Sequence, residues 1–420
     1  MKFVFYANVI SPHQLPFVKE VVAQFGEDEC RYVYAMPLGE GRRGLGWSEE
    51  NTFWMMSEWE QKEKSVQILE TARILMSGMR SVALFKRRTN HGRITIYTSE
   101  RWFKPPIGIL RLLNPHYRRM AKQFVRLLSE SEKLLYFPIG IHSARDMARL
   151  CGLMHGDLRC LFRAPKLDFE HKPGGRIYIR EQGIGNREQD KKYCLDKMRM
   201  WGYFVEASRQ SSVVGHQCQS QLATNDQQPT TNPPLTTNDY PLTTIKVLWV
   251  GRLLKLKRVD TIIRAVGELA KNFRNDKLHS PTQNSNFHAI TLDIYGTGPE
   301  EVRLKKLAAK YGDVIKFYPQ VPIDEIRNVM REHDVYVFSS NGYDGWGAVV
   351  SEALEEGMKV IGTHEAGASA TILPDDQLFK VGDWKRLKEM LNACDYTQKG
   401  IGNWSAKQAA KFILSFNWGV

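Results

Sequence analysis

The chain has 420 residues, more than one hydrophobic core normally holds, so we expect two domains. Hydrophobic residues make up 42% and charged residues 25%, which is ordinary for a globular protein, and no apolar run is long enough to span a bilayer. The net charge of +13 favours an anionic partner, which leaves nucleic acid, acidic lipid and phosphorylated small molecules as alternatives.

The six cysteines are scattered and form no Cys-x-x-Cys pair and no zinc spacing with histidine. Together with the absence of a recognisable signal peptide, this pattern favours a reducing, cytosolic location and predicts no metal site.

The first block, residues 1–207, is expected to be Rossmann-like. Its apolar runs predict a first strand within 2–9 and a helix over 15–26. Further strands are expected at 31–38, 81–88, 93–100 and 133–140.

A basic stretch at 101–128 interleaves cations with apolar and aromatic residues. One interpretation is a segment that lies on an anionic membrane surface. The other is an ordinary amphipathic core helix with a charged outer face.

Residues 208–243 are rich in Gln, Asn, Thr and Pro and predict a flexible linker or insertion. Residues 244–385 then alternate regularly, which predicts a parallel sheet with right-handed crossovers. The tail, 386–420, is expected to be helical and to pack back toward the first domain. The strands are expected at 245–251, 290–296, 314–319, 334–340 and 358–363, and the helices at 259–273, 299–312, 324–333 and 347–357.

The stretch DGWGAVVSE, residues 344–352, predicts a glycine-rich turn followed by a helix that starts near Trp346. The free N–H groups at such a helix start bind phosphate, and Gly345 and Gly347 let the backbone approach a ligand. Glu352 then lies about 8–9 Å further along, close to the step from a diphosphate to a ribose. The alternative is that Asp344 only caps the helix and Glu352 is a solvated surface charge.

Two cations, Arg252 and Lys257, follow the first strand of this block, at the edge where parallel sheets bind ligands. An arginine fork and a lysine point charge suit a diphosphate, although two ordinary basic residues beside a helix start would look the same. Gly296 and Gly298, in YGTGPEEV, do not form a dinucleotide fingerprint and predict a tight turn that lines the pocket.

These motifs, GRLLKLK, IYGTGPEE and DGWGAVVSEALEEGMKVIGT, resemble in order and spacing the nucleotide-sugar domain of retaining GT-B glycosyltransferases of family 4. The resemblance implies an α/β fold of two Rossmann-like domains whose parallel sheets face each other across a cleft. It also implies that Arg252 and Lys257 bind the donor diphosphate, that Glu352 binds the ribose and that Asp344 contacts the donor sugar. The donor-binding set is then Gly251, Gly296, Gly298, Gly345, Trp346, Gly347, Ala348 and Glu352, with Arg252, Lys257 and Asp344 as catalytic residues.

The chain departs from that family at two places. Asp344 stands where the family has Glu, and Gly367–Ala368 stands where it usually has a Gly-Gly pair followed by Glu.

The amino-terminal block resembles the bacterial surface-polysaccharide branch of the same family at 8–21, 97–104 and 197–206. His13 and Gln14, in a loop after the first strand, are candidates for the acceptor side, as are Glu100, Arg101 and His142. For each of them a structural role is the alternative: a packed or solvated loop, a helix-start ion pair, and a histidine near a helix cap.

The leading hypothesis is therefore a cytoplasmic, retaining, metal-independent glycosyltransferase without a cofactor, peripheral to the membrane. It would use a UDP- or GDP-sugar and a glycan or lipid-linked acceptor in surface polysaccharide biosynthesis. The alternatives are a nucleic-acid-binding protein, for which no recognisable motif is present, and an epimerase or phosphorylase of the same GT-B build.

Overall fold

The computed structural model describes residues 1–43, 52–180, 187–204, 244–276, 289–393 and 404–416. The predicted linker, 208–243, lies outside the described residues. Within the described part of the chain, no helix is both long and apolar enough to cross a membrane.

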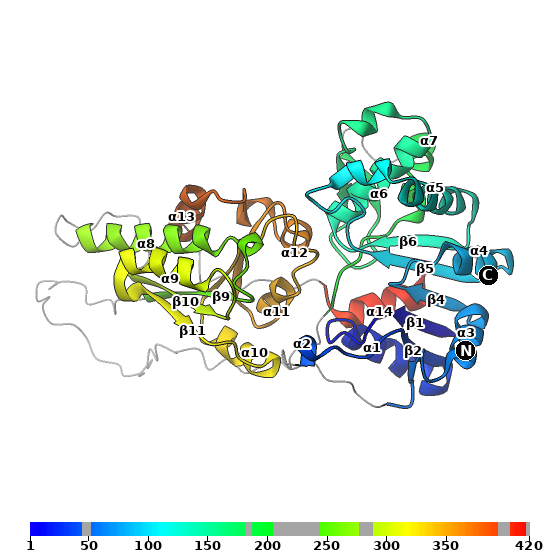
Figure 1. Ribbon diagram of the computed structural model, residues 1–420, viewed down its shortest axis with the longest axis horizontal. Coiled ribbons are helices and arrows are strands. Elements are labelled where there is room, and N and C mark those ends of the chain that lie inside the picture. Colours follow the sequence, from blue (N-terminus) through cyan, green and yellow to red (C-terminus); the bar gives the residue numbers. More distant parts are fainter. Residues whose placement is uncertain (44–51, 181–186, 205–243, 277–288, 394–403, 417–420) are drawn as a thin grey trace, which may run out of the picture.

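The chain folds into two lobes, each built on a six-stranded parallel sheet (Figure 1). The first sheet has the order β3-β2-β1-β4-β5-β6 and the second the order β11-β10-β9-β12-β13-β14. Both orders reverse beside the first strand, which creates a crevice at the carboxyl ends of the strands. The predicted α/β architecture with two parallel sheets is confirmed.

The strands of the first sheet are β1 (Phe3–Ala7), β2 (Cys30–Tyr34), β3 (Met55–Ser57), β4 (Ile74–Ser77), β5 (Ile94–Ser99) and β6 (Leu134–Pro138). Its helices are α1 (Leu15–Phe25), α2 (Glu40–Arg43), α3 (Lys62–Thr71), α4 (Val82–Asn90), α5 (Pro115–Glu130), α6 (Ile141–Met154) and α7 (Arg187–Lys192), and β7 (Leu167–Phe169) and β8 (Ile177–Ile179) form a small antiparallel pair.

The strands of the second sheet are β9 (Thr244–Val250), β10 (Ala289–Tyr295), β11 (Ile315–Tyr318), β12 (Val335–Phe338), β13 (Lys359–Thr363) and β14 (Leu378–Phe379). The helices are α8 (Val259–Asp276), α9 (Glu301–Ala308), α10 (Ile323–Arg331), α11 (Val349–Glu355), α12 (Gly367–Ile372), α13 (Trp384–Ala393) and α14 (Ala406–Ser415).

The last two helices belong to different lobes. Helix α13 packs against α8 of the second lobe, whereas α14, red in Figure 1, returns to the first lobe and packs beside α1. Ala409, Ala410 and Ile413 of α14 are fully buried. The carboxy-terminal segment therefore contributes to the core of the first lobe.

The strand predicted at 81–88 is wrong, because these residues begin helix α4. Ser81 caps the helix by accepting a hydrogen bond from the backbone N–H of Leu84 at 3.3 Å. The buried residues Leu84, Phe85 and Arg88 recur at helical spacing, a pattern that the continuous run Val-Ala-Leu-Phe obscures. Strand β4 at Ile74–Ser77, which the sequence did not suggest, lies between β1 and β5 in the sheet.

The basic stretch at 101–128 divides into two parts. Over Pro115–Glu130, the apolar face of α5 is buried in the core through Ala121, Phe124, Val125 and Leu128, so the core-helix interpretation is correct there. The preceding 3₁₀ helix, Gly108–Leu113, has no fully buried residue.

Arg88 is a buried cation that ties α4 to its neighbours. Only 1% of it is exposed, and its guanidinium donates to Thr95 Oγ1 at 3.0 Å and to the carbonyls of Leu69, Ala72 and Ile94 at 2.6, 2.9 and 2.7 Å. Burial lowers the pKa of Arg88 to about 10, so the side chain remains charged at pH 7.

We expect Arg88→Ala to lower the free energy of unfolding by about 3 kcal/mol or more, because several buried carbonyls lose their donor. Urea unfolding followed by circular dichroism measures the change. Arg87→Ala on the same helix is the control, since its exposed pair with Glu70 predicts a loss of about 1 kcal/mol at most. Equal losses in the two variants would contradict the structural role of Arg88.

Candidate active site

A pocket of about 420 Å³ lies at the carboxyl ends of the second sheet, where the two lobes meet. The second lobe supplies its floor and most of its wall: Val250, Gly251, Arg252, Lys257, Tyr295, Gln320, Val321, Ile326, Asp344, Gly345, Trp346, Gly347, Ala348, Val349 and Glu352. The first lobe closes it with His13, Glu100 and Tyr203. The pocket thus brings together eleven of the residues that the sequence singled out: His13, Glu100, Gly251, Arg252, Lys257, Asp344, Gly345, Trp346, Gly347, Ala348 and Glu352.

The loop that carries the two cations is held by the turn after β10. The backbone N–H of Gly251 donates to the carbonyl of Tyr295 at 3.0 Å, and that of Leu253 donates to Thr297 at 2.9 Å. Gly296 lies directly beneath this loop, and a Cβ there would stand 1.9 Å from the carbonyl oxygen of Gly251. A side chain at Gly298 would meet Leu253 in the same way. These two glycines do not line the pocket, contrary to the prediction; they shape the loop that does.

Arg252 and Lys257 both face the pocket but differ in their surroundings. Arg252 is exposed, whereas the side chain of Lys257 is only 19% exposed. The ammonium of Lys257 forms an ion pair with Asp344 and lies 5.6 Å from the ring centroid of Phe338. The hydroxyl of Ser339 donates to the carbonyl of Lys257 at 2.7 Å, which fixes this residue against β12. An anion entering the pocket would meet the exposed guanidinium of Arg252 and a lysine already held in place.

Helix α11 begins at Val349, so the predicted start near Trp346 is wrong. Gly347 adopts a φ of +91°, and this left-handed residue keeps 344–347 out of the helix. Glu352 consequently lies in the first turn of a seven-residue helix rather than two turns along it. The wall of the pocket at this point is a loop that carries Asp344, and the short helix α11 that follows it carries Glu352.

Glu352 is buried and reaches the first lobe. It is 8% exposed, and its carboxylate lies 3.4 Å from Nδ1 of His13, in the loop between β1 and α1. Burial lowers the pKa of His13 below its usual value, and this outweighs the opposing charge of Glu352. His13 is therefore mainly neutral at pH 7. The Glu352 carboxylate stays in the pocket as an acceptor for hydroxyl groups.

Glu100 enters the pocket from the other side, directly after β5. Its carboxylate packs on the backbone of Gly345, where a Cβ would stand 2.4 Å from it. Lys104 Nζ donates to Glu100 Oε2 at 2.6 Å, and the hydroxyl of Tyr203 lies 3.5 Å from Oε1. Gly345 is therefore the residue that admits a carboxylate from one lobe to the loop of the other.

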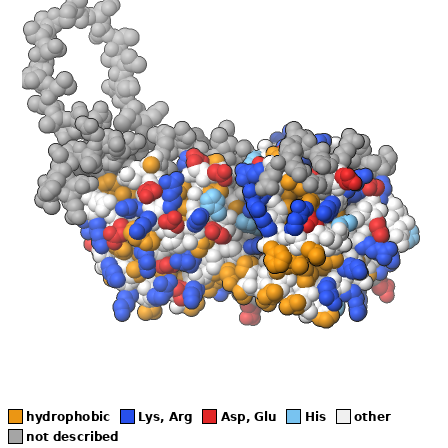
Figure 2. Space-filling model, turned by 90° about the horizontal axis from the view of Figure 1, so that it is seen from above, with side chains coloured by type: hydrophobic (Ala, Val, Ile, Leu, Met, Phe, Trp, Pro, Cys, Tyr) orange, Lys and Arg blue, Asp and Glu red, His pale blue; other side chains and the backbone are white. Residues whose placement is uncertain are grey.

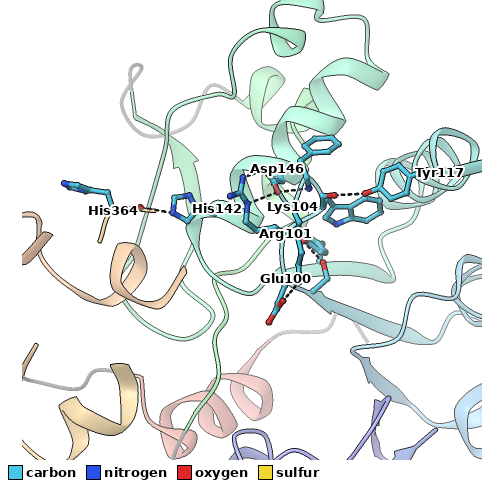
Figure 3. A network of polar contacts seen from close by, with 11 residues as sticks. Glu100, Arg101, Lys104, Tyr117, His142, Asp146 and His364 are labelled. Carbon is cyan, nitrogen blue, oxygen red and sulfur yellow. Dashed lines mark hydrogen bonds and ion pairs between the residues drawn. The ribbon is translucent and has the colours of Figure 1, made fainter. Parts of the chain in front are cut away.

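Three predicted acceptor-side residues do not line the pocket. Gln14 accepts a hydrogen bond from the Tyr32 hydroxyl at 3.1 Å. Arg101 donates to both carboxylate oxygens of Asp146, and His142 Nε2 lies 2.9 Å from the carbonyl oxygen of His364 in the second lobe (Figure 3). Burial and the nearby Arg101 and Arg145 lower the pKa of His142 to about 4. Each of these three residues makes a structural contact away from the pocket, and its role toward an acceptor stays a prediction.

Asp146 is a buried residue of α6 that the sequence did not suggest. It accepts from Arg101 at 3.2 and 3.3 Å and from the backbone N–H of Phe103 at 2.9 Å (Figure 3). The segment that follows β5, and with it Glu100, is thereby anchored on α6. Asp146 is a positioning residue rather than a pocket residue.

Sequence reasoning also missed several residues that line the pocket: Val250, Tyr203, Tyr295, Gln320, Val321, Ile326 and Val349. Tyr295 and Gln320 stand at or just after the carboxyl ends of β10 and β11, so the rule that placed Arg252 at this edge would also have indicated them. Tyr203 lies in the stretch 197–206, whose family resemblance did not lead to a site assignment for this residue.

The chemistry that this pocket allows follows from its charges. It holds two cations on one wall and three carboxylates, those of Glu100, Asp344 and Glu352, around them. Such a set suits an anionic group attached to groups that carry hydroxyls. Among the described residues, no group of three or more His, Cys, Asp or Glu side chains is arranged to hold a metal ion.

The fold defines the class of protein. The structure of Anabaena Alr3699/HepE in complex with UDP is similar over 98% of this chain and 94% of that one, with 14% identity and a TM-score of 0.51. The OtsA apo structure covers 99% and 98%, with 10% identity and a TM-score of 0.55. The chain has the GT-B fold of these proteins.

The second domain also resembles a known family. Residues 238–394 match the model described as glycosyl transferases group 1. The uncharacterized glycosyltransferase MJ1069 of Methanocaldococcus jannaschii is 28% identical over 130 residues, 31% of this chain and 30% of the relative.

A second curated relative is the GtfA subunit of the UDP-N-acetylglucosamine–peptide N-acetylglucosaminyltransferase of Limosilactobacillus reuteri. It is 23% identical over 233 residues, 50% of this chain and 41% of the relative. The alignments thus span less than half the length of the curated relatives.

We expect Asp146→Asn to lower the free energy of unfolding by about 1.5–3 kcal/mol, because the charged hydrogen bonds from Arg101 are lost. Denaturant titration measures the loss. The matched control is Asp168→Asn, whose carboxylate is 3.6 Å from the exposed Arg180 and whose loss we expect to be close to zero. An equal loss of unfolding free energy in the two variants would contradict the positioning role of Asp146.

Proposed function

We propose that this protein is a retaining glycosyltransferase that moves a sugar from a UDP- or GDP-sugar to a glycan or lipid-linked acceptor. The observation that carries the proposal is the convergence of Arg252, Lys257, Asp344 and Glu352 in one pocket, closed by His13 and Glu100 from the other domain. The group 1 match of residues 238–394 supports the same class of reaction.

The donor would lie along the second sheet. Arg252 and Lys257 would bind the diphosphate, with Lys257 exchanging its contact with Asp344 for one with a phosphate oxygen. Glu352 would accept hydrogen bonds from the ribose hydroxyls. The neighbour from Anabaena was solved with UDP, which supports a nucleoside diphosphate as the ligand.

The sugar would face Asp344 and the loop Gly345–Ala348, opposite Glu100 and His13. In this arrangement the pocket stabilises the leaving diphosphate electrostatically and excludes water, and retention would need no protein nucleophile. Asp344 is one methylene shorter than the glutamate of the related family, so we expect the selectivity for the donor sugar to depend on this position.

The proposed setting is the synthesis of surface polysaccharide in the cytoplasm, without a metal ion or other cofactor. The UDP complex of one neighbour and the group 1 domain support the use of a nucleotide-sugar and leave acceptor and pathway as parts of the proposal.

We expect Arg252→Ala and Lys257→Ala each to weaken the binding of UDP or GDP by about 1.5–3 kcal/mol, the scale of a charged hydrogen bond. Isothermal titration calorimetry measures the affinity. Lys255→Ala is the control, because this exposed lysine of the same loop does not line the pocket and its loss should leave the affinity unchanged. Unchanged affinity in both pocket variants would contradict the donor site.

We expect EDTA to leave the transfer rate unchanged, and UDP or GDP to be released from its sugar only when an acceptor is present. A coupled assay for the free nucleotide measures both. Loss of activity in EDTA that Mn²⁺ or Mg²⁺ restores would overturn metal independence, and release without an acceptor would favour hydrolysis or another GT-B reaction.

A further inference from the structure

An exposed apolar row lies on the 3₁₀ helix Gly108–Leu113 and the residue before it. Ile107, Leu110 and Leu113 are 52%, 60% and 75% exposed. Side chains three residues apart lie above one another in a 3₁₀ helix, so these three form one row. Ile109 and Leu112 pack against the core and fix the segment to the domain. The packing of Ile109 and Leu112 therefore fixes the 3₁₀ helix with the three exposed side chains toward solvent.

Exposed cations of α5 lie beside this row. From residue 101 to 129 the chain has no acidic residue and seven basic ones: Arg101, Lys104, Arg111, Arg118, Arg119, Lys122 and Arg126. Arg118, Arg119 and Lys122 are exposed on the first turns of α5, which packs directly against the 3₁₀ helix. Figure 2 shows hydrophobic side chains gathered on the first lobe, with Lys and Arg side chains beside them.

We propose that this basic apolar surface, formed by Ile107, Leu110, Leu113, Arg118, Arg119 and Lys122, binds an anionic lipid bilayer. The three aliphatic side chains would enter the acyl boundary while the cations meet the headgroups. The aliphatic side chains that would enter the bilayer belong to the 3₁₀ segment and not to the apolar face of α5, which is buried.

The charges and side-chain types argue against other occupants. In a symmetric dimer through this surface the same cations would face one another, which would oppose association. A nucleic acid would take the cations but would leave the aliphatic row without a partner, since single-stranded bases stack on aromatic side chains. A bilayer with anionic headgroups satisfies both features at once.

The surface is close to the pocket along the chain. Lys104 and Glu100 form an ion pair at 2.6 Å, and Ile107 follows three residues after Lys104. If the proposed function holds, a lipid-linked acceptor would therefore be presented beside the carboxylate that enters the pocket.

The test is flotation of the full chain with vesicles of phosphatidylcholine containing phosphatidylglycerol, compared with vesicles of phosphatidylcholine alone. We expect binding to the anionic vesicles only, decreasing as salt is raised. The triple variant Arg118→Gln, Arg119→Gln and Lys122→Gln should bind on the order of 100-fold more weakly, since each cation near the surface contributes about 1 kcal/mol. The triple variant Ile107→Ser, Leu110→Ser and Leu113→Ser should also bind at least about tenfold more weakly.

Two matched controls accompany these variants. Lys306→Gln, Lys310→Gln and Lys316→Gln remove three exposed cations of the second lobe and should leave vesicle binding within about twofold of that of the unmodified chain. Leu158→Ser, Leu161→Ser and Phe162→Ser remove three other exposed apolar side chains of the first lobe and should likewise leave it unchanged. Circular dichroism verifies that every variant is folded.

Failure of the unmodified chain to float with anionic vesicles at low salt would overturn the proposal. So would equal binding by the 107–113 variant and the unmodified chain, or loss of binding only in the 158–162 variant. Binding of single-stranded RNA in a filter assay without binding of vesicles would assign the surface to nucleic acid instead. None of these measurements depends on glycosyl transfer, so the surface and the proposed function can fail separately.

Discussion

The side chain of Trp346 packs into the first lobe and is one of the main contacts that join the two halves of the molecule. It is 1% exposed although it stands on a loop of the second lobe, because it inserts between Gly140 and Gly202 of the first lobe. A Cβ on Gly202 would stand 2.7 Å from the indole. The ring also packs edge-on against Tyr203 at 6.4 Å. The residue that forms the pocket wall thus also joins the lobes.

This coupling has a consequence for the pocket. Two residues of the loop 344–347 contact other parts of the pocket. Asp344 pairs with Lys257, and Gly345 leaves room for the carboxylate of Glu100 from the first lobe. Any shift of one lobe relative to the other must therefore move the loop that would contact a donor sugar. Closure of the cleft and arrangement of the pocket are linked through apolar packing, which is short-ranged and tolerates few alternative geometries.

Prediction from sequence succeeded where burial made the pattern simple. Strand β12 is buried along its whole length and β9 is buried from Val247 to Trp249, so their apolar residues form continuous runs and both strands were expected close to their observed bounds. The run at 81–88 has the same appearance but forms α4, since the capping Ser81 and the buried contacts of Arg88 favour a helix. A short apolar run does not by itself distinguish a buried strand from a buried helix.

The sequence by itself determined that Arg252, Lys257 and Asp344 belong to one sheet edge, because parallel strands place every carboxyl end on the same side. Only the tertiary structure decided which lobe-one residues join them. His13 and Glu100 reach the pocket, whereas Arg101 turns to Asp146 and His142 to the carbonyl of His364. Local patterns specify where an element ends, but the contacts between lobes depend on side chains hundreds of residues apart, and such pairings have no periodic signature in the chain.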